Sequence, residues 1–165
     1  MDRPVSVNIC FVCLGNICRS PLAEGIFEHL VHREGFSEYI RIDSAGTSAW
    51  HEGELADSRM RDTAKGNGIE LNSRARQFVP SDFDRFDLVI AMDQSNFNQL
   101  QGLRSKEVIK EKLFLFRFFD PKNDGNLEVP DPYYGGNNGF QLVFSIIDRT
   151  CPKLLDYIKT RFSIS

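Results

Sequence analysis

The sequence predicts an α/β protein with three layers, in which a four-stranded parallel sheet carries helices on both faces. Two observations lead to this prediction. Short runs of apolar, often β-branched residues recur along the chain, and such continuous runs are typical of strands buried on both faces. Segments with the helical spacing of apolar residues separate these runs. Strands that alternate with helices form parallel sheets through right-handed crossovers.

Length and composition are those of a globular protein. A chain of 165 residues is expected to form one domain, residues 1–165, and about 70% of the unfolded surface becomes buried at this size. An apolar content of 41% with 26% charged residues excludes a disordered or collagen-like chain. No run approaches the roughly 18 apolar residues of a membrane span. The net charge of −3 gives no basic footprint for nucleic acid.

The first predicted strand covers residues 5–12, and a short polar loop at residues 13–19 ends it. Ser20 and Pro21 indicate that a helix starts next, because serine caps helix N-termini and proline fits the first helical turn. Apolar residues then recur at four-residue spacing, which predicts an amphipathic helix that ends near Gly35.

The remaining elements follow from the same criteria. Three further strands are predicted, at residues 40–45, 88–92 and 113–116, and residues 88–92 are a short apolar run. Apolar spacing predicts two short helices and a longer C-terminal one, at residues 57–66, 93–100 and 140–158. Pro152 lies inside the last of these and should kink or split it.

Two loops are expected, at residues 46–53 and 120–139. The first contains Trp50, the only tryptophan. The second is rich in proline, glycine, asparagine and aspartate, and connections of this length are usually functional or mobile. The phenylalanines between Phe114 and Phe119 are interpreted as core residues, with one left exposed.

The segment from Cys13 to Ser20, between the first strand and the first helix, is predicted to be a phosphate loop. Backbone N–H groups in such a loop point inward, and the helix dipole favours negative charge there. Arg19 can bind two oxygens of a phosphate with its planar guanidinium. The amides, the dipole and Arg19 also stabilise the thiolate form of Cys13. A bound tetrahedral phosphate would therefore face a nucleophile.

Asp131, in the second loop, supplies the other half of this chemistry. Phosphoryl transfer to a thiolate expels an alkoxide or phenoxide, which a carboxylic acid within reach can protonate. The same carboxylate can then deprotonate the water that attacks the phosphoenzyme. Asp131-Pro132 alone is more often a plain turn, so its combination with the phosphate loop is what indicates catalysis. Tyr134, close to it in the sequence, is interpreted as a packing residue.

These segments resemble the low molecular weight protein tyrosine phosphatase family. The resemblance rests on Val-Cys-Leu-Gly-Asn-Ile-Cys-Arg-Ser-Pro at residues 12–21 and Asp-Pro-Tyr-Tyr at 131–134. Further matches follow in order over nearly the whole chain: Asp-Ser-Ala-Gly-Thr at 43–47 with Trp50, Ala-Arg-Gln at 75–77, and Ala-Met-Asp-Gln-Ser-Asn at 91–96. The resemblance implies hydrolysis of phosphate monoesters, with tyrosine-phosphorylated proteins or small aryl phosphates as substrates.

The resemblance also implies a catalytic role for three residues. Cys13 is expected to be the nucleophile, forming a phosphocysteine, and Asp131 the general acid and base. Arg19 is expected to clamp the phosphate together with the backbone amides of the phosphate loop, which belong to Leu14, Gly15, Asn16, Ile17 and Cys18. No metal or other cofactor is expected, because Arg19 and these amides take its place.

Five more residues receive supporting roles from the resemblance. The side chain of Asn16 is expected to fix the loop shape by hydrogen bonds, and Ser44 to support Asn16. The hydroxyl of Ser20 is expected to hydrogen-bond the thiolate. Trp50 and Tyr133 are expected to wall a cleft for a flat aromatic leaving group.

Ser73 departs from the family pattern. In the better-known eukaryotic members a histidine occupies this position and joins the hydrogen-bond network of Asn16 and Ser44. Serine is shorter, so we expect a rewired network with retained activity and altered loop stiffness. Asp93, at the end of the third predicted strand, is expected either to brace the phosphate loop or to cap the helix that follows it.

The four cysteines do not predict a metal or redox motif of the Cys-x-x-Cys type. Cys10 and Cys13 have this spacing, but an odd interval on a strand directs two side chains to opposite faces. Cys10 and Cys151 are interpreted as core residues. The resemblance implies that Cys18 traps an oxidised Cys13 as a disulfide; the alternative is that Cys18 points into the core behind the loop and only packs there.

Compartment and assembly are expected from weaker signals. The N-terminus lacks the apolar stretch of a secretory signal, and the cysteine spacing is a poor disulfide framework. We therefore expect a cytoplasmic, monomeric protein that binds neither membranes nor nucleic acid.

Three other functions fit parts of the pattern. A thiol-dependent arsenate reductase of similar fold needs resolving cysteines, and none lies between Cys18 and Cys151. A non-catalytic phosphate-binding module would not need Cys13, Arg19 and Asp131 together. A phosphocysteine carrier of the sugar-transport type would not need Asp131.

Overall fold

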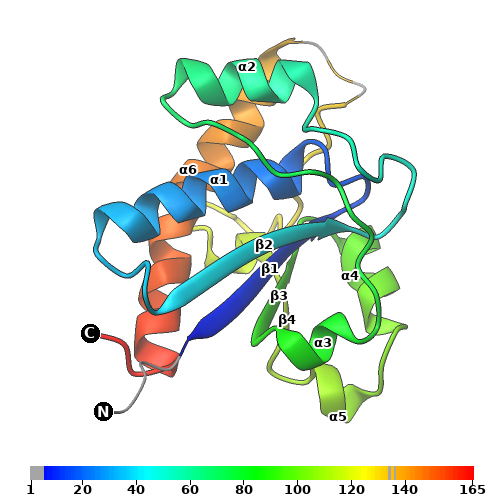
Figure 1. Ribbon diagram of the computed structural model, residues 1–165, viewed down its shortest axis with the longest axis vertical. Coiled ribbons are helices and arrows are strands. Elements are labelled where there is room, and N and C mark those ends of the chain that lie inside the picture. The colour runs from blue at the N-terminus through cyan, green and yellow to red at the C-terminus, as the bar shows by residue number, and fades with distance from the viewer. Residues whose placement is uncertain (1–5, 134, 136) are drawn as a thin grey trace.

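The computed structural model describes residues 6–133, 135 and 137–165. Val5 of the first predicted strand and Tyr134 lie outside the described residues. Four parallel strands form one sheet in the order β2-β1-β3-β4. The strands are β1 (Val7–Cys13), β2 (Ile40–Gly46), β3 (Leu88–Ala91) and β4 (Leu113–Leu115). The predicted parallel sheet is confirmed (Figure 1).

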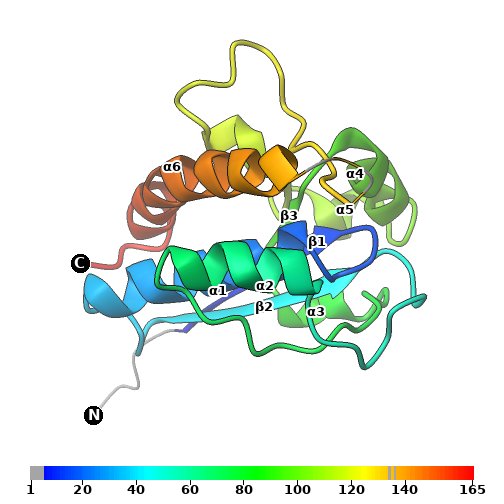
Figure 2. The same ribbon diagram turned by 90° about the horizontal axis from the view of Figure 1, so that it is seen from above.

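Helices cover both faces of the sheet, which gives the predicted three layers (Figure 2). One face carries α1 (Arg19–Arg33), α2 (Ser58–Gly66) and α6 (Asn137–Arg161). The other carries α3 (Asp82–Arg85), α4 (Gln94–Gln101) and α5 (Lys106–Ile109). Within the described residues, no helix has both the length and the apolar character of a membrane span.

The side chains of β1 alternate between two hydrophobic clusters on the two faces of the sheet. Phe11 packs edge-to-face against Phe27 and Phe116, with ring centroids 5.8 and 5.7 Å apart. Cys13 belongs to this same cluster, whereas Cys10 belongs to the cluster on the other face. The two-residue period of a strand explains the alternation, and the prediction that Cys10 and Cys13 face opposite sides is confirmed.

Pro152 does not split the C-terminal helix, so this part of its prediction is wrong. The helix α6 runs through Pro152 without interruption. Pro152 has no N–H, so the carbonyl of Asp148 loses its helical donor. Both residues lie on the exposed side of α6, where water can bind this carbonyl. Cys151 and Leu154 on either side of the proline are fully buried, so packing holds both halves of the helix in line.

The predicted fourth strand ends one residue early, because Phe116 begins a 3₁₀ helix, η1 (Phe116–Phe119). The expectation for the phenylalanines there is confirmed. Phe116 is fully buried, Phe119 nearly so, and Phe118 is the exposed member. The short helices α3 and α5 were not predicted, since four residues leave no periodic pattern to detect.

The segment that follows η1 is fixed by a buried carboxylate. Asp120 accepts hydrogen bonds of 2.9 Å from both Arg117 and Arg149. Burial alone would raise the pKa of Asp120, but these arginines and the amide of Lys122 lower it to about 2. Further along, the amide of Val129 donates to the carbonyl of Met92, the residue that directly follows β3. These anchors bring the segment to the carboxyl end of the sheet, next to the loop between β1 and α1.

Candidate active site

The loop between β1 and α1, residues 14–18, is held from outside through its carbonyl groups. The carbonyl of Leu14 accepts a hydrogen bond of 3.0 Å from the amide of Ser48, and that of Ile17 accepts one of 2.7 Å from the amide of Asp57. In the described part of the chain, the amides of residues 14–18 have no protein acceptor. Together with the N-terminus of α1 they form a positive cradle for an anion.

Asn16 fixes the shape of this loop. Its backbone is left-handed, with φ of 56°, a conformation that asparagine tolerates better than most residues. Its side chain is buried, and its Oδ1 accepts a hydrogen bond of 3.0 Å from the amide of Arg76. Its Nδ2 donates to the hydroxyls of Ser20 and Ser44 at 2.8 and 2.9 Å. Three segments far apart in the sequence therefore hold the loop.

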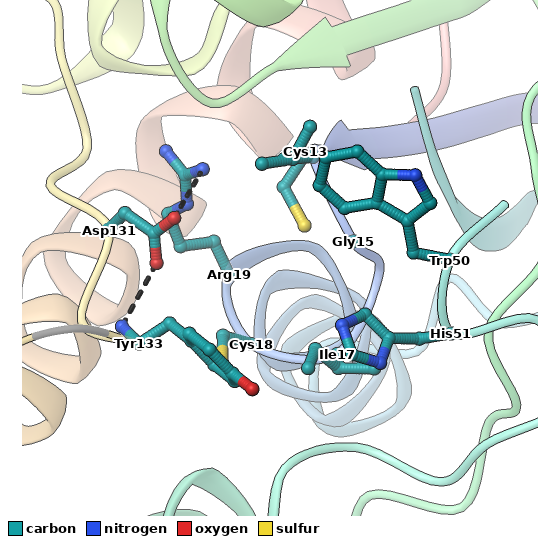
Figure 3. Close-up of a pocket in the computed structure, with 10 residues that line it drawn as sticks. Cys13, Gly15, Ile17, Cys18, Arg19, Trp50, His51, Asp131 and Tyr133 are labelled. Carbon is teal, nitrogen blue, oxygen red and sulfur yellow. Dashed lines mark hydrogen bonds and ion pairs between the residues drawn. The ribbon is translucent and has the colours of Figure 1, made fainter. Parts of the chain in front are cut away.

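Cys13 ends β1, with its sulfur facing the middle of the pocket (Figure 3). Its Sγ lies 3.0 Å from the hydroxyl of Ser20, in the first turn of α1. Only 3% of Cys13 is exposed, so a reactant reaches the sulfur only through this pocket.

Arg19 is buried and held by three oxygens. Its Nη1 donates to Asp93 at 2.7 Å and to the carbonyl of Val129 at 2.9 Å, and its Nη2 lies 3.6 Å from the carboxylate of Asp131. Burial alone would lower the pKa of Arg19, but Cys13, Asp93 and Asp131 together raise it above its ordinary value. The guanidinium therefore stays charged beside the sulfur.

Asp131 lies on the same side of the pocket as Arg19 (Figure 3). One of its carboxylate oxygens accepts a hydrogen bond of 3.0 Å from the amide of Tyr133, and the other faces Arg19 (Figure 3). About a third of the side chain is exposed, 34%, so water can reach it. Arg59 anchors Tyr133 in turn. Its guanidinium donates to the carbonyl of Tyr133 at 3.2 Å and lies 5.5 Å from the centroid of the Tyr133 ring.

Aromatic side chains stand on both sides of the pocket mouth. Trp50 and His51 lie on the side opposite Arg19 and Asp131 (Figure 3). The rings of His51 and Tyr133 lie 6.2 Å apart, centroid to centroid. Trp50 is 76% exposed and presents a large apolar surface beside the pocket. The pocket is lined by Cys13, Leu14, Gly15, Ile17, Cys18, Arg19, Trp50, His51, Asp131 and Tyr133.

The structure thus brings the predicted catalytic and wall residues to one pocket and places the others behind it. Asn16, Ser20 and Ser44 lie behind the phosphate loop. Asp93 braces the phosphate loop through Arg19 and also caps α4, whereas the sequence left these two roles as alternatives. One of its oxygens accepts from Arg19, and the other accepts from the amide of Asn96 at 2.8 Å, at the start of α4. No cluster of three or more His, Cys, Asp or Glu that could hold a metal ion occurs in the described residues.

Asn16, Ser20 and Ser44 form a hydrogen-bond network behind the phosphate loop. Ser73 lies at the end of this network, not at its centre. The hydroxyl of Ser44 donates to Glu24 on α1 at 2.6 Å, and Ser73 lines the same cavity as this carboxylate. The network of Asn16 and Ser44 therefore continues to a glutamate that the sequence analysis missed. The signal that could have found it is spacing, because Glu24 follows Ser20 by four residues and lies on the same face of α1.

His51 was also missed. It follows Trp50 in the sequence and lines the pocket, and its Nδ1 pairs with the carboxylate of Glu54. A lone histidine in a loop carries no periodic signal, and only its place next to Trp50 could have suggested it.

Glu24 is the titratable group of the hydrogen-bond network behind the phosphate loop. Burial is the main cause that raises its pKa, with help from the nearby Glu28 and Asp43, and the hydrogen bonds from Ser44 and Ser73 partly oppose this. The result is a pKa of about 7. A carboxyl whose pKa is higher in the folded than in the unfolded state favours folding when protonated. That stabilisation is complete below about pH 4.5 and is lost as the pH rises towards 7.

A Glu24→Gln variant should therefore be more stable than the parent protein at pH 8 but not at pH 5. Glutamine has a similar shape and stays neutral, so it removes the cost of the ionised, partly buried carboxylate. We expect a gain of about 1–2 kcal/mol at pH 8, discounted for partial exposure. Urea denaturation at both pH values measures it, with the exposed Glu38→Gln as control. An equal effect of Glu24→Gln at both pH values would contradict the assignment.

Comparisons with known proteins agree with this geometry. Residues 8–163 match the sequence model of the family described as low molecular weight phosphotyrosine protein phosphatase. The low molecular weight protein-tyrosine-phosphatase of Streptomyces coelicolor is 42% identical over 94% of this chain and 95% of its own. The Homo sapiens low molecular weight phosphotyrosine protein phosphatase is 38% identical over 94% and 98%.

A solved structure extends the agreement to three dimensions. The crystal structure of a protein tyrosine phosphatase from Entamoeba histolytica superposes with a TM-score of 0.89 at 41% identity and covers 96% of this chain and 99% of that one. Sequence and fold lead to the same assignment over nearly the whole length. The chain belongs to the low molecular weight phosphotyrosine protein phosphatase family.

Proposed function

We propose that this protein hydrolyses aryl phosphate monoesters, chiefly phosphotyrosine in proteins, through a phosphocysteine intermediate. One observation carries the proposal: the sulfur of Cys13, the cradle of loop amides, the guanidinium of Arg19 and the carboxyl of Asp131 meet in a single pocket. A nucleophile, an anion site and a proton donor are the parts that phosphoryl transfer to sulfur requires.

Substrate binding begins with the phosphate. The amides of residues 14–18 and the N-terminus of α1 donate hydrogen bonds to its oxygens, and Nη2 of Arg19 binds one more. Asp93 and the carbonyl of Val129 hold the other side of the guanidinium, so little ordering remains to be done when phosphate arrives. The phosphate takes over the Arg19 contact of Asp131.

The first chemical step forms the sulfur–phosphorus bond and breaks the bond between phosphorus and the tyrosyl oxygen. The sulfur of Cys13 lies at the floor of the cradle, and the hydroxyl of Ser20 at 3.0 Å stabilises it as the thiolate. Asp131 stands on the pocket wall and gives its proton to the departing oxygen. The products are a phosphocysteine and the free phenol.

The second step hydrolyses the phosphocysteine and regenerates the free enzyme. The exposed side of Asp131 admits water, from which the carboxylate removes a proton while the oxygen attacks phosphorus. The phosphorus–sulfur bond breaks, inorganic phosphate leaves and Cys13 is again a thiolate. Arg19 and the loop amides balance the phosphate charge in both steps, so the proposal includes no metal or other cofactor.

The walls of the pocket support an aromatic substrate. Trp50 and Tyr133 stand on either side of the mouth, where they can contact the two faces of a phenyl ring. We expect the substrates to be tyrosine-phosphorylated proteins or small aryl phosphates, and we expect the enzyme to act as a cytoplasmic monomer.

Steady-state turnover tests this function directly. The purified protein should release phosphate from an aryl phosphate and from a phosphotyrosine peptide, with unchanged rate in the presence of a metal chelator. A phosphoserine peptide is the control and should react far more slowly, because its alkoxide is a poorer leaving group and lacks the ring. Absence of turnover on both aromatic substrates would reject the proposal.

The arsenate reductase alternative gains no support from the structure. A disulfide relay needs resolving cysteines beyond the first partner of the nucleophile, so that the disulfide can be passed on. Cys151 lies fully buried within α6 and Cys10 packs on the other face of the sheet. Only Cys18 shares the pocket with Cys13.

Cys18 should protect Cys13 from irreversible oxidation. Both sulfurs border the same pocket, and peroxide converts a reactive thiolate first to a sulfenic acid, which a neighbouring thiol can capture as a disulfide with release of water. Burial raises the pKa of Cys18 well above its ordinary value, so Cys18 does not compete with Cys13 for phosphate. When Cys18 attacks the sulfenic acid, its proton leaves with the hydroxyl of the sulfenic acid as water.

We therefore expect peroxide to inactivate the protein reversibly, with recovery in dithiothreitol and a Cys13–Cys18 bridge in the peptide map. Cys18→Ser should lose activity at about the same rate but recover much less of it. Cys151→Ser is the matched control and should recover like the parent. Equal recovery of the parent and of Cys18→Ser after the same exposure would rule out the protective role.

A further inference from the structure

Arg59 connects two segments that the proposed chemistry brings together. It lies in the first turn of α2, and its Nε and Nη2 atoms donate to the two carboxylate oxygens of Asp57 at 3.1 and 3.0 Å. Its Nη2 also donates to the carbonyl of Tyr133 at 3.2 Å, although 74 positions separate the two residues in the sequence. One planar guanidinium therefore binds α2 and the segment of the general acid at the same time.

Asp57 is the fixed point for this arginine. It caps the N-terminus of α2, where its carboxylate accepts a hydrogen bond of 2.8 Å from the amide of Arg59. Its own amide donates to the carbonyl of Ile17 in the phosphate loop at 2.7 Å. The hydrogen bonds from Arg59 lower the pKa of Asp57, so the carboxylate stays charged. Arg59 is therefore held at a defined place relative to the phosphate loop.

On its other side, Arg59 holds Tyr133 at two points, the carbonyl and the ring. The guanidinium lies 5.5 Å from the centroid of the Tyr133 ring and 4.7 Å from that of Phe140, a buried residue of α6. Both distances allow attraction between the cation and the ring. The carbonyl carbon, the side chain and the amide nitrogen of Tyr133 are attached to one Cα atom. Holding the first two therefore restricts the direction of the Tyr133 N–H.

That N–H is the group that orients the carboxyl of Asp131. It donates to Oδ1 of Asp131 at 3.0 Å, while Oδ2 lies 3.6 Å from Arg19. In the proposed reaction, bound phosphate takes over the contact with Arg19, and the Tyr133 amide then remains to hold the carboxyl. Before Asp131 the chain is anchored through Val129, whose amide donates to the carbonyl of Met92 at 2.8 Å. The anchor after Asp131 is Tyr133.

We propose that Arg59 is a positioning residue for the general acid. Its guanidinium, fixed by Asp57, holds Tyr133 so that the Tyr133 amide keeps the carboxyl of Asp131 beside the departing oxygen. The inference rests on the proposed function, in which Asp131 gives that oxygen its proton. Arg59 is not among the residues that line the pocket, so it acts through Tyr133. A misplacement of about 1 Å at a reacting group can cost about 10²-fold in rate.

The test uses Arg59→Met and Arg59→Lys, with Arg61→Met as the matched control. Methionine keeps an apolar stem but loses the charge and every donor, whereas lysine keeps the charge without the planar fork. The side chain of Arg59 is 43% exposed, so its replacement should leave the protein folded. Arg61 lies in the same helix and donates to the carbonyl of Ala56 at 2.9 Å, so it controls for the loss of one cation from α2.

The first readout is phenol release in a single turnover, for aryl phosphates whose phenols differ in acidity. Arg59→Met should lose about 10–100-fold with the least acidic phenol and stay within about twofold of the parent with the most acidic one, because only a poor leaving group needs the proton. Arg59→Lys should show the same dependence with a smaller loss. Arg61→Met should match the parent throughout. Inhibition by inorganic phosphate should be the same in all variants, since the anion site is untouched.

Combination with Asp131→Asn shows whether Arg59 acts through the acid. The asparagine has no proton to deliver, so the position of this side chain no longer matters for the departing oxygen. Adding Arg59→Met to Asp131→Asn should therefore cost less than about twofold, although the same change is costly in the parent.

The second readout does not need turnover, because it follows the Tyr133 amide itself. The protein is prepared with isotope-labelled tyrosine, and exchange of this amide with water is measured by NMR. The signal of Tyr133 is identified by its loss in Tyr133→Phe. Exchange should be about fivefold faster in Arg59→Met than in the parent, the usual net worth of one hydrogen bond, and unchanged in Arg61→Met.

The two readouts keep this inference separate from the proposed function. If the parent hydrolyses no aryl phosphate, the proposed function fails, and the exchange rates still decide whether Arg59 holds Tyr133. If the parent is active, a loss of equal size for every phenol, a full further loss on top of Asp131→Asn, or an Arg59→Met variant as active as the parent would overturn the inference while the function stands. Unchanged exchange of the Tyr133 amide in Arg59→Met would overturn it in either case.

Discussion

A Cys13→Ser variant is expected to show aryl phosphatase activity at background level while it still binds phosphate or vanadate. Serine keeps the shape of the side chain but replaces a thiolate by an alcohol that stays protonated near neutral pH. The amides of residues 14–18 and Arg19 are untouched, so the anion site remains. Turnover with an aryl phosphate and a phosphate-binding titration on the same preparation measure the two properties.

Cys10→Ser is the matched control for this variant. Cys10 lies on the same strand but packs on the other face of the sheet, so its replacement should leave the anion site and turnover in place if the protein folds. Substantial turnover by Cys13→Ser would refute covalent catalysis by this residue.

An Asp131→Asn variant should lose roughly 10²–10⁴-fold in kcat for substrates with poor leaving groups, the usual worth of general acid–base catalysis. The amide retains the shape and can still accept from the Tyr133 amide, but it cannot deliver a proton. The loss in the transfer step should shrink as the leaving phenol becomes more acidic, because such a phenolate departs without help.

A series of aryl phosphates with increasingly acidic phenols measures this dependence. Single-turnover release of the phenol isolates the transfer step from the later hydrolysis, where the same carboxylate acts as base. Asp124→Asn, in the same loop but outside the pocket, is the control. A loss of equal size for every leaving group would show that Asp131 is not the acid.

Most of the fold could be predicted because two of its strands, β1 and β3, are short and almost entirely apolar. β1 and β3 are buried at nearly every position, which leaves an unbroken apolar run in the sequence. Local rules fail where packing decides. Pro152 sits in an intact helix because it lies on the exposed side, and residues flanking it are buried in the core. Nothing local distinguishes that situation from a broken helix.

The candidate site could be predicted to the extent that it is local. Cys13, Arg19 and Ser20 lie on one strand–loop–helix unit, so their sequence spacing fixes their arrangement. Asp131 comes from a distant segment, and its placement depends on Asp120 and Val129, which anchor that segment to α6 and to the end of β3. The motif indicated the chemistry of Asp131 but not these anchors.

The part that escaped prediction is the network behind the loop. Ser73 predicts a rewired network around Asn16 and Ser44, but the sequence does not name the members of that network. In the structure the hydroxyl of Ser44 donates to Glu24. Such partners are set by the approach of α1 to β2, which no motif encodes.

The most direct test of the whole account is to trap the phosphoenzyme. The protein is mixed with an aryl phosphate of an acidic phenol, quenched with denaturant within the first turnover, and digested for peptide mapping. The account predicts a burst of phenol equal to the enzyme concentration, with phosphate on Cys13 and a longer-lived phosphopeptide in Asp131→Asn. Phosphate on another residue, or full turnover with no phosphoenzyme and no burst under conditions where hydrolysis of the intermediate is the slow step, would contradict it.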